Sequence, residues 1–181
     1  MSSSHTPPAH ELPQLAQVFE LLRRGHHICS FDGAPHRALT EYQDQFKTLF
    51  AALGFELVAH HRDFFYFRTQ GKPSDTASRM ALFVLILVED LSNRGRDIEQ
   101  TLLNEPFTLG ELPHLESERH QRIMNEAGVH GPEDLEKVVS LLDRFGFAHR
   151  QGPNVFTFRP PVCRFLDLCL DVLADEEGEE S

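Results

Sequence analysis

The chain has 181 residues, of which 40% are hydrophobic and 25% are charged, close to the average of a globular protein. This composition excludes collagen-like and wholly disordered chains, and the length allows one domain or two small ones. The longest apolar run, residues 81–88, is far short of the roughly 20 residues that span a bilayer. Residues 1–11 have neither a basic start nor an apolar stretch, so we expect no secretory signal and a cytoplasmic protein.

The formal net charge is −11, from 28 acidic against 17 basic residues, and residues 175–181 hold a dense group of the acids. A charge of this sign repels a polyanion at long range. Any contact with nucleic acid must therefore come from a local basic patch or through another protein.

The first half of the chain reads as helices followed by a hairpin. Apolar residues at three- and four-residue spacing predict a helix from Leu12 that ends at Gly25. The elements predicted after it are a short extended segment at 26–30, a turn at 31–35, a helix at 38–53 and two strands at 55–59 and 64–68. The breaker cluster at 71–74 indicates an internal boundary.

The second half begins with a strongly apolar helix at 77–91, which we expect to be buried on more than one side. The elements predicted after it are extended pieces within 97–112, helices at 116–127 and 132–145, strands at 147–150 and 155–159, and a helix at 162–174. We expect the two ends of the chain, residues 1–11 and the acidic tail 175–181, to be disordered.

The two halves repeat each other. Leu53-Gly54-Phe55, then Arg62, then Phe65-Tyr66-Phe67-Arg68 correspond to Phe145-Gly146-Phe147, Arg150 and Phe156-Thr157-Phe158-Arg159. Upstream, Arg24-Gly25 corresponds to Arg94-Gly95 at a smaller offset, which implies an insertion of 22 residues in the second half. A helix-rich unit closed by a hairpin is typical of a winged helix. We predict an α+β, mostly helical protein with tandem winged-helix domains at 12–71 and 74–174, each closed by a β-hairpin wing.

The usual catalytic signatures are missing from the sequence. It contains no GxGxxG, GxxxxGK[ST], HExxH or GxSxG, so we expect no enzyme, no catalytic residue and no cofactor. The pairs His26-His27 and His60-His61 suggest a metal, but neighbours on a strand point to opposite faces, so polar surface histidines are the favoured interpretation. Three cysteines without CxxC spacing, Cys29, Cys163 and Cys169, are expected to be buried thiols.

A winged helix offers a recognition helix and a wing to DNA. The candidate DNA contacts are the basic residues of these elements: Arg37, Lys47, Arg62, Arg68, Arg150 and Arg159. The same helices also carry acids, among them Glu41, Asp44 and Glu136, which favour contact with protein over contact with phosphate. An ordinary solvated or paired side chain is an equally good interpretation of each arginine.

The first hairpin is aromatic on both of its faces. Phe64, Phe65 and Phe67 follow one another with Tyr66 between them, so a free wing would expose one apolar face to water. We expect that face to be covered by the second domain, by a second copy of the chain or by a peptide partner. These phenylalanines are the candidate partner or dimer surface.

The sequence resembles the MksE/MukE family of small accessory subunits of bacterial condensin-like complexes. The residues that bear the resemblance are Leu21-Leu22-Arg23-Arg24-Gly25-His26-His27-Ile28, Tyr42, Phe50, Leu53-Gly54-Phe55-Glu56-Leu57 and Phe64-Phe65-Tyr66-Phe67. The resemblance covers most of residues 12–174 and implies a dimeric tandem winged-helix "kite" protein that binds a kleisin. Through the kleisin it would join an SMC-type ATPase in entrapping DNA, for chromosome organisation and segregation or for plasmid defence, in the cytoplasm at the nucleoid.

Two other functions stay open on the residues. A winged-helix transcription regulator would bind DNA in a sequence-specific manner, and its affinity would fall steeply with salt. A metal-dependent enzyme would use the histidine pairs. The architectural subunit is the hypothesis that the repeat, the aromatic hairpin and the family resemblance favour together.

Overall fold

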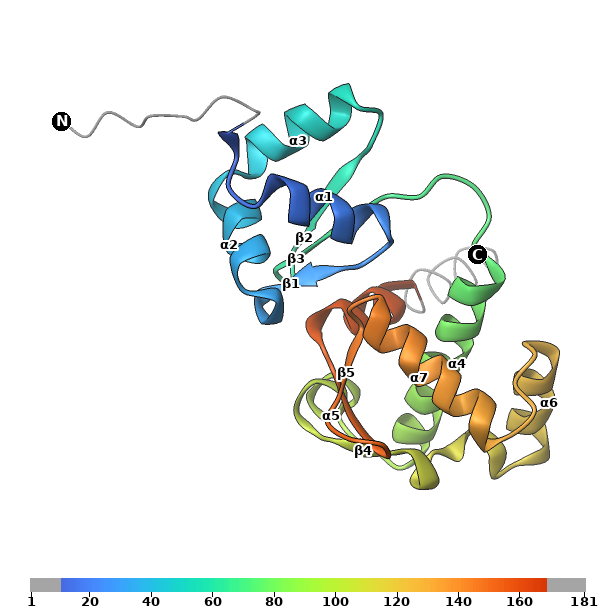
Figure 1. The fold of residues 1–181 in the computed structure, drawn as a ribbon. Coiled ribbons are helices and arrows are strands. Elements are labelled where there is room, and N and C mark those ends of the chain that lie inside the picture. The colour runs from blue at the N-terminus through green and yellow to red at the C-terminus, as the bar shows by residue number, and fades with distance from the viewer. Residues whose placement is uncertain (1–10, 169–181) are drawn as a thin grey trace, which may run out of the picture. The chain divides into compact units, whose positions relative to one another are not determined.

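The chain divides between Gln70 and Gly71 into two units, each with a hydrophobic core of its own. The structure, a computed structural model, describes residues 11–168 (Figure 1). It is α+β and mostly helical, with a three-stranded antiparallel sheet in each unit. No helix within the described range is long and apolar enough to cross a bilayer. The predictions for the N-terminal segment up to residue 10, for Cys169, for the end of the last helix and for the acidic tail lie outside the described residues.

The first unit packs three helices against a small sheet (Figure 1). Its elements are α1 (Leu15–Arg23), β1 (Ile28–Cys29), the 3-10 turn η2 (Ser30–Asp32), α2 (Ala34–Glu41), α3 (Gln43–Ala52), β2 (Leu57–His60) and β3 (Phe64–Phe67). The strand order is β1-β3-β2, so the short strand β1 pairs with β3, the second strand of the hairpin, which becomes the central strand of the sheet. Helix α1 buries Val18 and Leu22 in the core and ends at Arg23. Gly25, which follows its cap, has φ of 82°, a conformation that glycine adopts easily because it has no Cβ.

The helix predicted at 38–53 is two helices. Helix α2 already begins at Ala34, because Pro35 fits its first turn, and Tyr42 then leaves helical geometry with φ −118° and ψ 35°. The break lets α2 bury Leu39 and α3 bury Phe46 in the same core from different directions. Two short helices therefore share a core that one straight helix could reach only along a single stripe.

The second unit has more helices around an equivalent sheet (Figure 1). Its elements are α4 (Asp75–Asn93), α5 (Ile98–Asn104), β4 (Phe107–Thr108), the 3-10 turns η3 (Leu109–Glu111) and η4 (Pro113–Leu115), α6 (Glu118–Glu126), α7 (Pro132–Arg144), β5 (Ala148–Arg150), β6 (Val155–Phe158), the 3-10 turn η5 (Pro160–Val162) and a helix from 163 that the structure describes to 168. The strand order is β4-β6-β5. Ser74, Asp97 and Ser117 each cap a helix by accepting a hydrogen bond from a backbone N–H of its first turn.

The two predicted hairpins are confirmed, and so is the glycine that precedes each of them. Gly54 and Gly146 have φ of 84° and 83°, and the residue after each donates its N–H to the carbonyl oxygen five residues earlier: Phe55 to Phe50 and Phe147 to Leu142, both at 2.8 Å. The same glycine-terminated helix end thus turns the chain back toward the helix before each hairpin.

Other parts of the predicted repeat are wrong. The residues after Arg94-Gly95 form α5, because the Asp97 side chain caps a helix there, whereas the residues after Arg24-Gly25 lead into β1. The counterpart of β1 is β4: Ile28 pairs with Phe65 as Phe107 pairs with Phe156. Phe107 follows Ile28 by 79 residues, and Phe156 follows Phe65 by 91 residues. The insertion in the second unit between the first strand and the hairpin is therefore 12 residues and not 22.

The correspondence of Arg62 with Arg150 is also wrong. Arg150 pairs with Phe156, whereas Phe65, the counterpart of Phe156, pairs with Ala59. Arg62 lies in the turn beyond β2, outside the paired register. Two arginines at similar distances from a glycine therefore occupy different places in the two units.

Candidate functional site

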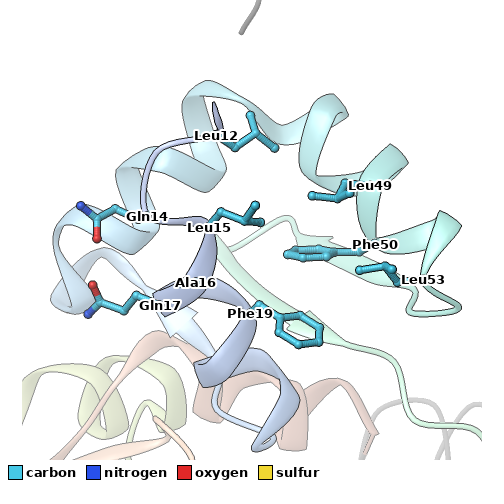
Figure 2. Close-up of a pocket in the computed structure, with 9 residues that line it drawn as sticks. All are labelled: Leu12, Gln14, Leu15, Ala16, Gln17, Phe19, Leu49, Phe50 and Leu53. Carbon is cyan, nitrogen blue, oxygen red and sulfur yellow. The ribbon is translucent and has the colours of Figure 1, made fainter. Parts of the chain in front are cut away.

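An apolar groove lies between α1 and α3 of the first unit. It has a volume of about 910 Å³. The residues that line it are Leu12, Gln14, Leu15, Ala16, Gln17, Phe19, Leu49, Phe50 and Leu53. Figure 2 shows the leucines and phenylalanines gathered between the two helices, with the two glutamines at the opposite edge. None of the nine is charged, so this groove is the most uniformly apolar depression described on that unit.

The local sequence explains why apolar side chains remain at this surface. Leu15 and Phe19 lie four residues apart on α1, so they share one face, and α3 contributes Leu49 and Leu53 at the same spacing. The core already holds Val18 and Phe50, which are fully buried. Leu53 sits at the end of α3 with 57% of its surface exposed, so the groove presents leucine to solvent.

A second groove, of about 660 Å³, lies between α4 and α6 of the second unit. The residues that line it are Asp75, Ser78, Arg79, Leu82, Leu85, Ile86, Glu89, Arg119, Ile123, Glu126, Ala127 and Gly128. Its middle is aliphatic and its two ends are charged. Leu85 is 43% exposed there, so the expectation that helix 77–91 is buried on more than one side fails at this position.

Interactions between the two helices hold the walls of the second groove. Near the start of α4, Arg79 Nε donates to the carbonyl oxygen of Ala127 at 2.8 Å. Near its end, Glu89 is paired with Arg119. The other two acids of the lining, Asp75 and Glu126, are exposed and make no ion pair with any described residue.

The candidate DNA contacts do not form one basic patch within either unit. Arg68 is paired with Glu56 at 3.1 Å, and Arg150 with Glu136 at 2.9 Å. Arg150 also donates to the Ser140 hydroxyl and to the Pro153 carbonyl oxygen, each at 2.8 Å. Arg68 thus joins the two ends of its own hairpin, and Arg150 holds the second hairpin against α7.

The other four candidates are scattered over different elements. Arg37 lies on α2 and Lys47 on α3, and neither has a side-chain partner among the described residues. Arg62 and Arg159 are partly buried and have interactions of their own. Among residues 11–70, the first unit therefore offers two unpaired cations, on different helices, for contact with phosphate.

The aromatic hairpin is packed inside the first unit. Phe65 is 3% exposed and belongs to the core, and Phe67 stacks on Phe55 with ring centroids 4.8 Å apart. Phe64 is fully buried and stacks on His60 at 4.2 Å. Residues of the same unit thus lie against both faces of the strand, so these side chains act in packing. The leucines that the structure exposes for a partner in the two grooves are instead Leu53 and Leu85, one in each groove.

His26 and His27 are part of the fold as well. His26 Nε2 lies 3.1 Å from Asp32 Oδ1, and the His27 ring stacks on Tyr66 at 5.1 Å. His27 is 6% exposed, so the prediction of surface histidines is wrong for this pair. The prediction of buried thiols is confirmed for Cys29 and Cys163.

The grooves were missed because sequence reasoning assigned apolar positions at helical spacing to the core. A signal for the second groove exists in α4, where Leu82 and Leu85 add an apolar face beyond the core residues Phe83, Ile86 and Leu87. A helix that is apolar all round has more surface to bury than one neighbouring core can accept.

Comparison with known proteins assigns the chain to a family. The family model of the condensin complex protein MksE matches residues 13–170, which include most of both units. A search of curated proteins finds no match to the sequence. The match confirms the resemblance on which the sequence analysis relied. The chain belongs to the MksE family and is thus a condensin complex protein.

Proposed function

We propose that the chain is a non-enzymatic accessory subunit, of the kite type, in a bacterial condensin-like complex, and that both units are winged-helix domains. The order of elements supports the winged-helix assignment. Helix, strand, two helices and hairpin follow one another as α1-β1-α2-α3-β2-β3 and as α5-β4-α6-α7-β5-β6. The short strand joins the inner strand of the hairpin in both sheets.

The observation on which the proposal chiefly rests is the uncharged groove between α1 and α3, which we assign to a second copy of the chain. In a two-fold symmetric interface, residues near the axis meet their own counterparts. A charged lining would bring like charges together there, whereas leucine and phenylalanine are self-complementary. The lining of this groove holds no charge and the exposed Leu53, so it suits a homodimer.

The dimer would bind a kleisin and, through it, an SMC-type ATPase, and the assembly would entrap DNA at the nucleoid. Chromosome organisation and plasmid defence both fit this role, because the partner subunits decide between them. Direct DNA binding by a regulator is the weaker alternative. Helix α3 exposes Asp44 beside Lys47, and the candidate arginines of the hairpins are paired within the chain.

Light-scattering mass of the purified full chain, alone and mixed with the kleisin subunit of the same complex, tests the proposal. We expect the wild type to have the mass of two chains and Leu53→Asp to have the mass of one. The control Leu168→Asp, which changes a similarly exposed leucine of the second unit, should remain a dimer. A wild-type chain that stays monomeric at high concentration and does not bind the kleisin would contradict the proposal.

A further inference from the structure

The groove between α4 and α6 has the spacing of a helix-binding surface. Seven of its lining residues lie on α4 as one stripe: Asp75, Ser78, Arg79, Leu82, Leu85, Ile86 and Glu89. Their separations of three and four residues are those of a coiled-coil seam, which accepts knobs from a facing helix. Helix α6 supplies the second wall with Arg119, Ile123 and Glu126 at the same spacing, and Ala127 follows directly after its end.

The charges at the two ends of this groove differ. The helices run antiparallel, because Arg79 near the start of α4 contacts Ala127 beyond the end of α6, and Glu89 near the end of α4 contacts Arg119 in the first turn of α6. The end with Glu89 is neutral, since its acid and base are paired. The other end holds Asp75 and Glu126, both exposed and unpaired within the described residues, together with the Arg79 guanidinium, which bonds to a carbonyl oxygen and not to an acid. Two acids against one base leave this end with a net negative charge.

The acidic end is also held in place. The Arg79 guanidinium donates to the carbonyl oxygen of Ala127, and a side chain at Gly128 would meet its Nη2 at 3.3 Å. Gly128 has φ of 78°, which the chain needs to end α6 beside α4. The groove is therefore present before any partner arrives, which lowers the ordering cost of binding.

We propose that this groove binds an amphipathic helix of another subunit of the complex, with an apolar stripe at three- and four-residue spacing and lysine or arginine at the end that lies against Asp75 and Glu126. Apolar anchors of the incoming helix would cover Leu82, Leu85 and Ile123. This is the helix-in-groove mode of recognition, with the orientation of the helix set by charge. The inference rests on the proposed function, in that the helix belongs to the kleisin.

Charge argues against other occupants. The acidic residues 175–181 of the chain itself would be repelled by Asp75 and Glu126. DNA would be repelled for the same reason. A second copy would have to supply a basic amphipathic helix. Helix α1, which ends in Arg23, buries Val18 and Leu22 in its own unit, and its Leu15 and Phe19 line the groove already assigned to the dimer.

Titration of the kleisin subunit into the full chain, followed by calorimetry, tests the inference. Leu85→Asp should weaken binding by about tenfold or more, because it places a charge in the middle of an apolar contact. The double variant Asp75→Lys and Glu126→Lys should also weaken binding and should abolish the loss of affinity with added salt that we expect of the wild type. All three positions are exposed, so the variants should fold, and thermal unfolding verifies this.

Two matched controls make the same chemical changes outside the groove. Leu168→Asp replaces another exposed leucine of the second unit, and Glu111→Lys reverses an exposed acid on η3. Both should leave the kleisin affinity within about twofold of the wild type.

The outcomes separate this inference from the proposed function. A kleisin that binds the wild type and every variant equally well overturns the groove assignment and leaves the proposed function standing. A kleisin that does not bind the wild type overturns both. If Leu85→Asp changes the light-scattering mass from two chains to one, the occupant is a second copy and the inference is wrong.

Discussion

His114 illustrates how completely a polar side chain is used for packing in the second unit. Its ring is fully buried and stacks on Phe83 with centroids 4.0 Å apart, while Nε2 donates to the Phe83 carbonyl oxygen at 2.7 Å. Burial lowers the pKa of His114 to about 4, since a charged ring there would lose its hydration. The side chain is therefore neutral at physiological pH and ties η4 to α4.

Acid should destabilise the protein through His114. The pKa of His114 is about 6.5 in the unfolded chain and about 4 in the folded protein. Between these two pH values the unfolded state therefore binds more protons than the folded state. The free energy of unfolding should fall as the pH falls through this window, by up to about 3 kcal/mol in all. Urea denaturation at pH 7 and at pH 5 measures the fall. His114→Gln keeps a donor but does not titrate, so its stability should depend less on pH; an equal dependence would contradict the assignment.

Truncation of the hairpin phenylalanines tests their role in packing. Phe65→Ala should lower the free energy of unfolding by about 3–5 kcal/mol, because Phe65 is 3% exposed and lies in the core of the first unit. Leu53→Ala, at an exposed position, should change it by less than about 1 kcal/mol. Chemical denaturation measures both. A small loss for Phe65→Ala would instead show that the ring is available to a partner.

At the scale of elements, the junction from helix to hairpin is the feature that both units share most closely. Gly54 and Gly146 have nearly equal positive φ, and the residue after each closes the helix with the same hydrogen bond. This geometry sets the direction in which each hairpin leaves its helix. The register of each sheet, and with it the burial of the hairpin, depends on that direction.

Gly54→Ala should therefore lower the free energy of unfolding by about 1 kcal/mol or more, since a Cβ disfavours φ of 84° even though nothing lies within 4 Å of it. The control is Gly110→Ala, because Gly110 has the same free space and no positive φ. That variant should be neutral or slightly more stable. Equal effects of the two substitutions on the thermal midpoint would argue against backbone strain as the cause.

At the scale of the whole molecule, the pairing of charges decides which partners the chain can hold. Within the described residues, the basic side chains without a partner are Arg37, Lys47, Lys72 and Arg122, and they lie on both units. Most arginines instead bind carboxylates or carbonyl oxygens of the chain. Together with the net charge of −11, this favours contacts with protein over direct contacts with DNA.

The chain alone should bind duplex DNA weakly and without sequence preference. Even if all four unpaired cations contacted phosphate, the slope of log affinity against log salt would be no steeper than about −4. Fluorescence anisotropy with a labelled duplex measures the slope, and selection from a random duplex pool measures the preference. A steeper slope with a selected consensus would favour the transcription regulator over the architectural subunit.

Much of the fold could be predicted because its signals are local. The hairpins, the glycine that precedes each of them and the helices at 116–127 and 132–145 depend on turn residues and spacing within a few residues of each element. Helix α5 was missed because a short helix at 98–104, next to Pro106, shows too few turns of periodicity to distinguish it from a strand. Its cap, Asp97, was the available signal.

The sequence by itself determined the α+β class, the repeat of helices and hairpin, and the buried thiols at Cys29 and Cys163, because these follow from local spacing and composition. It also identified the family, through its resemblance to the MksE/MukE proteins. Only the tertiary structure decided that Phe65 belongs to the core, that Arg150 is held by Glu136, and which leucines line the two grooves. Burial and ion pairing join residues far apart in the chain. An apolar position at helical spacing is the same in sequence whether the helix turns that face inward or toward a partner.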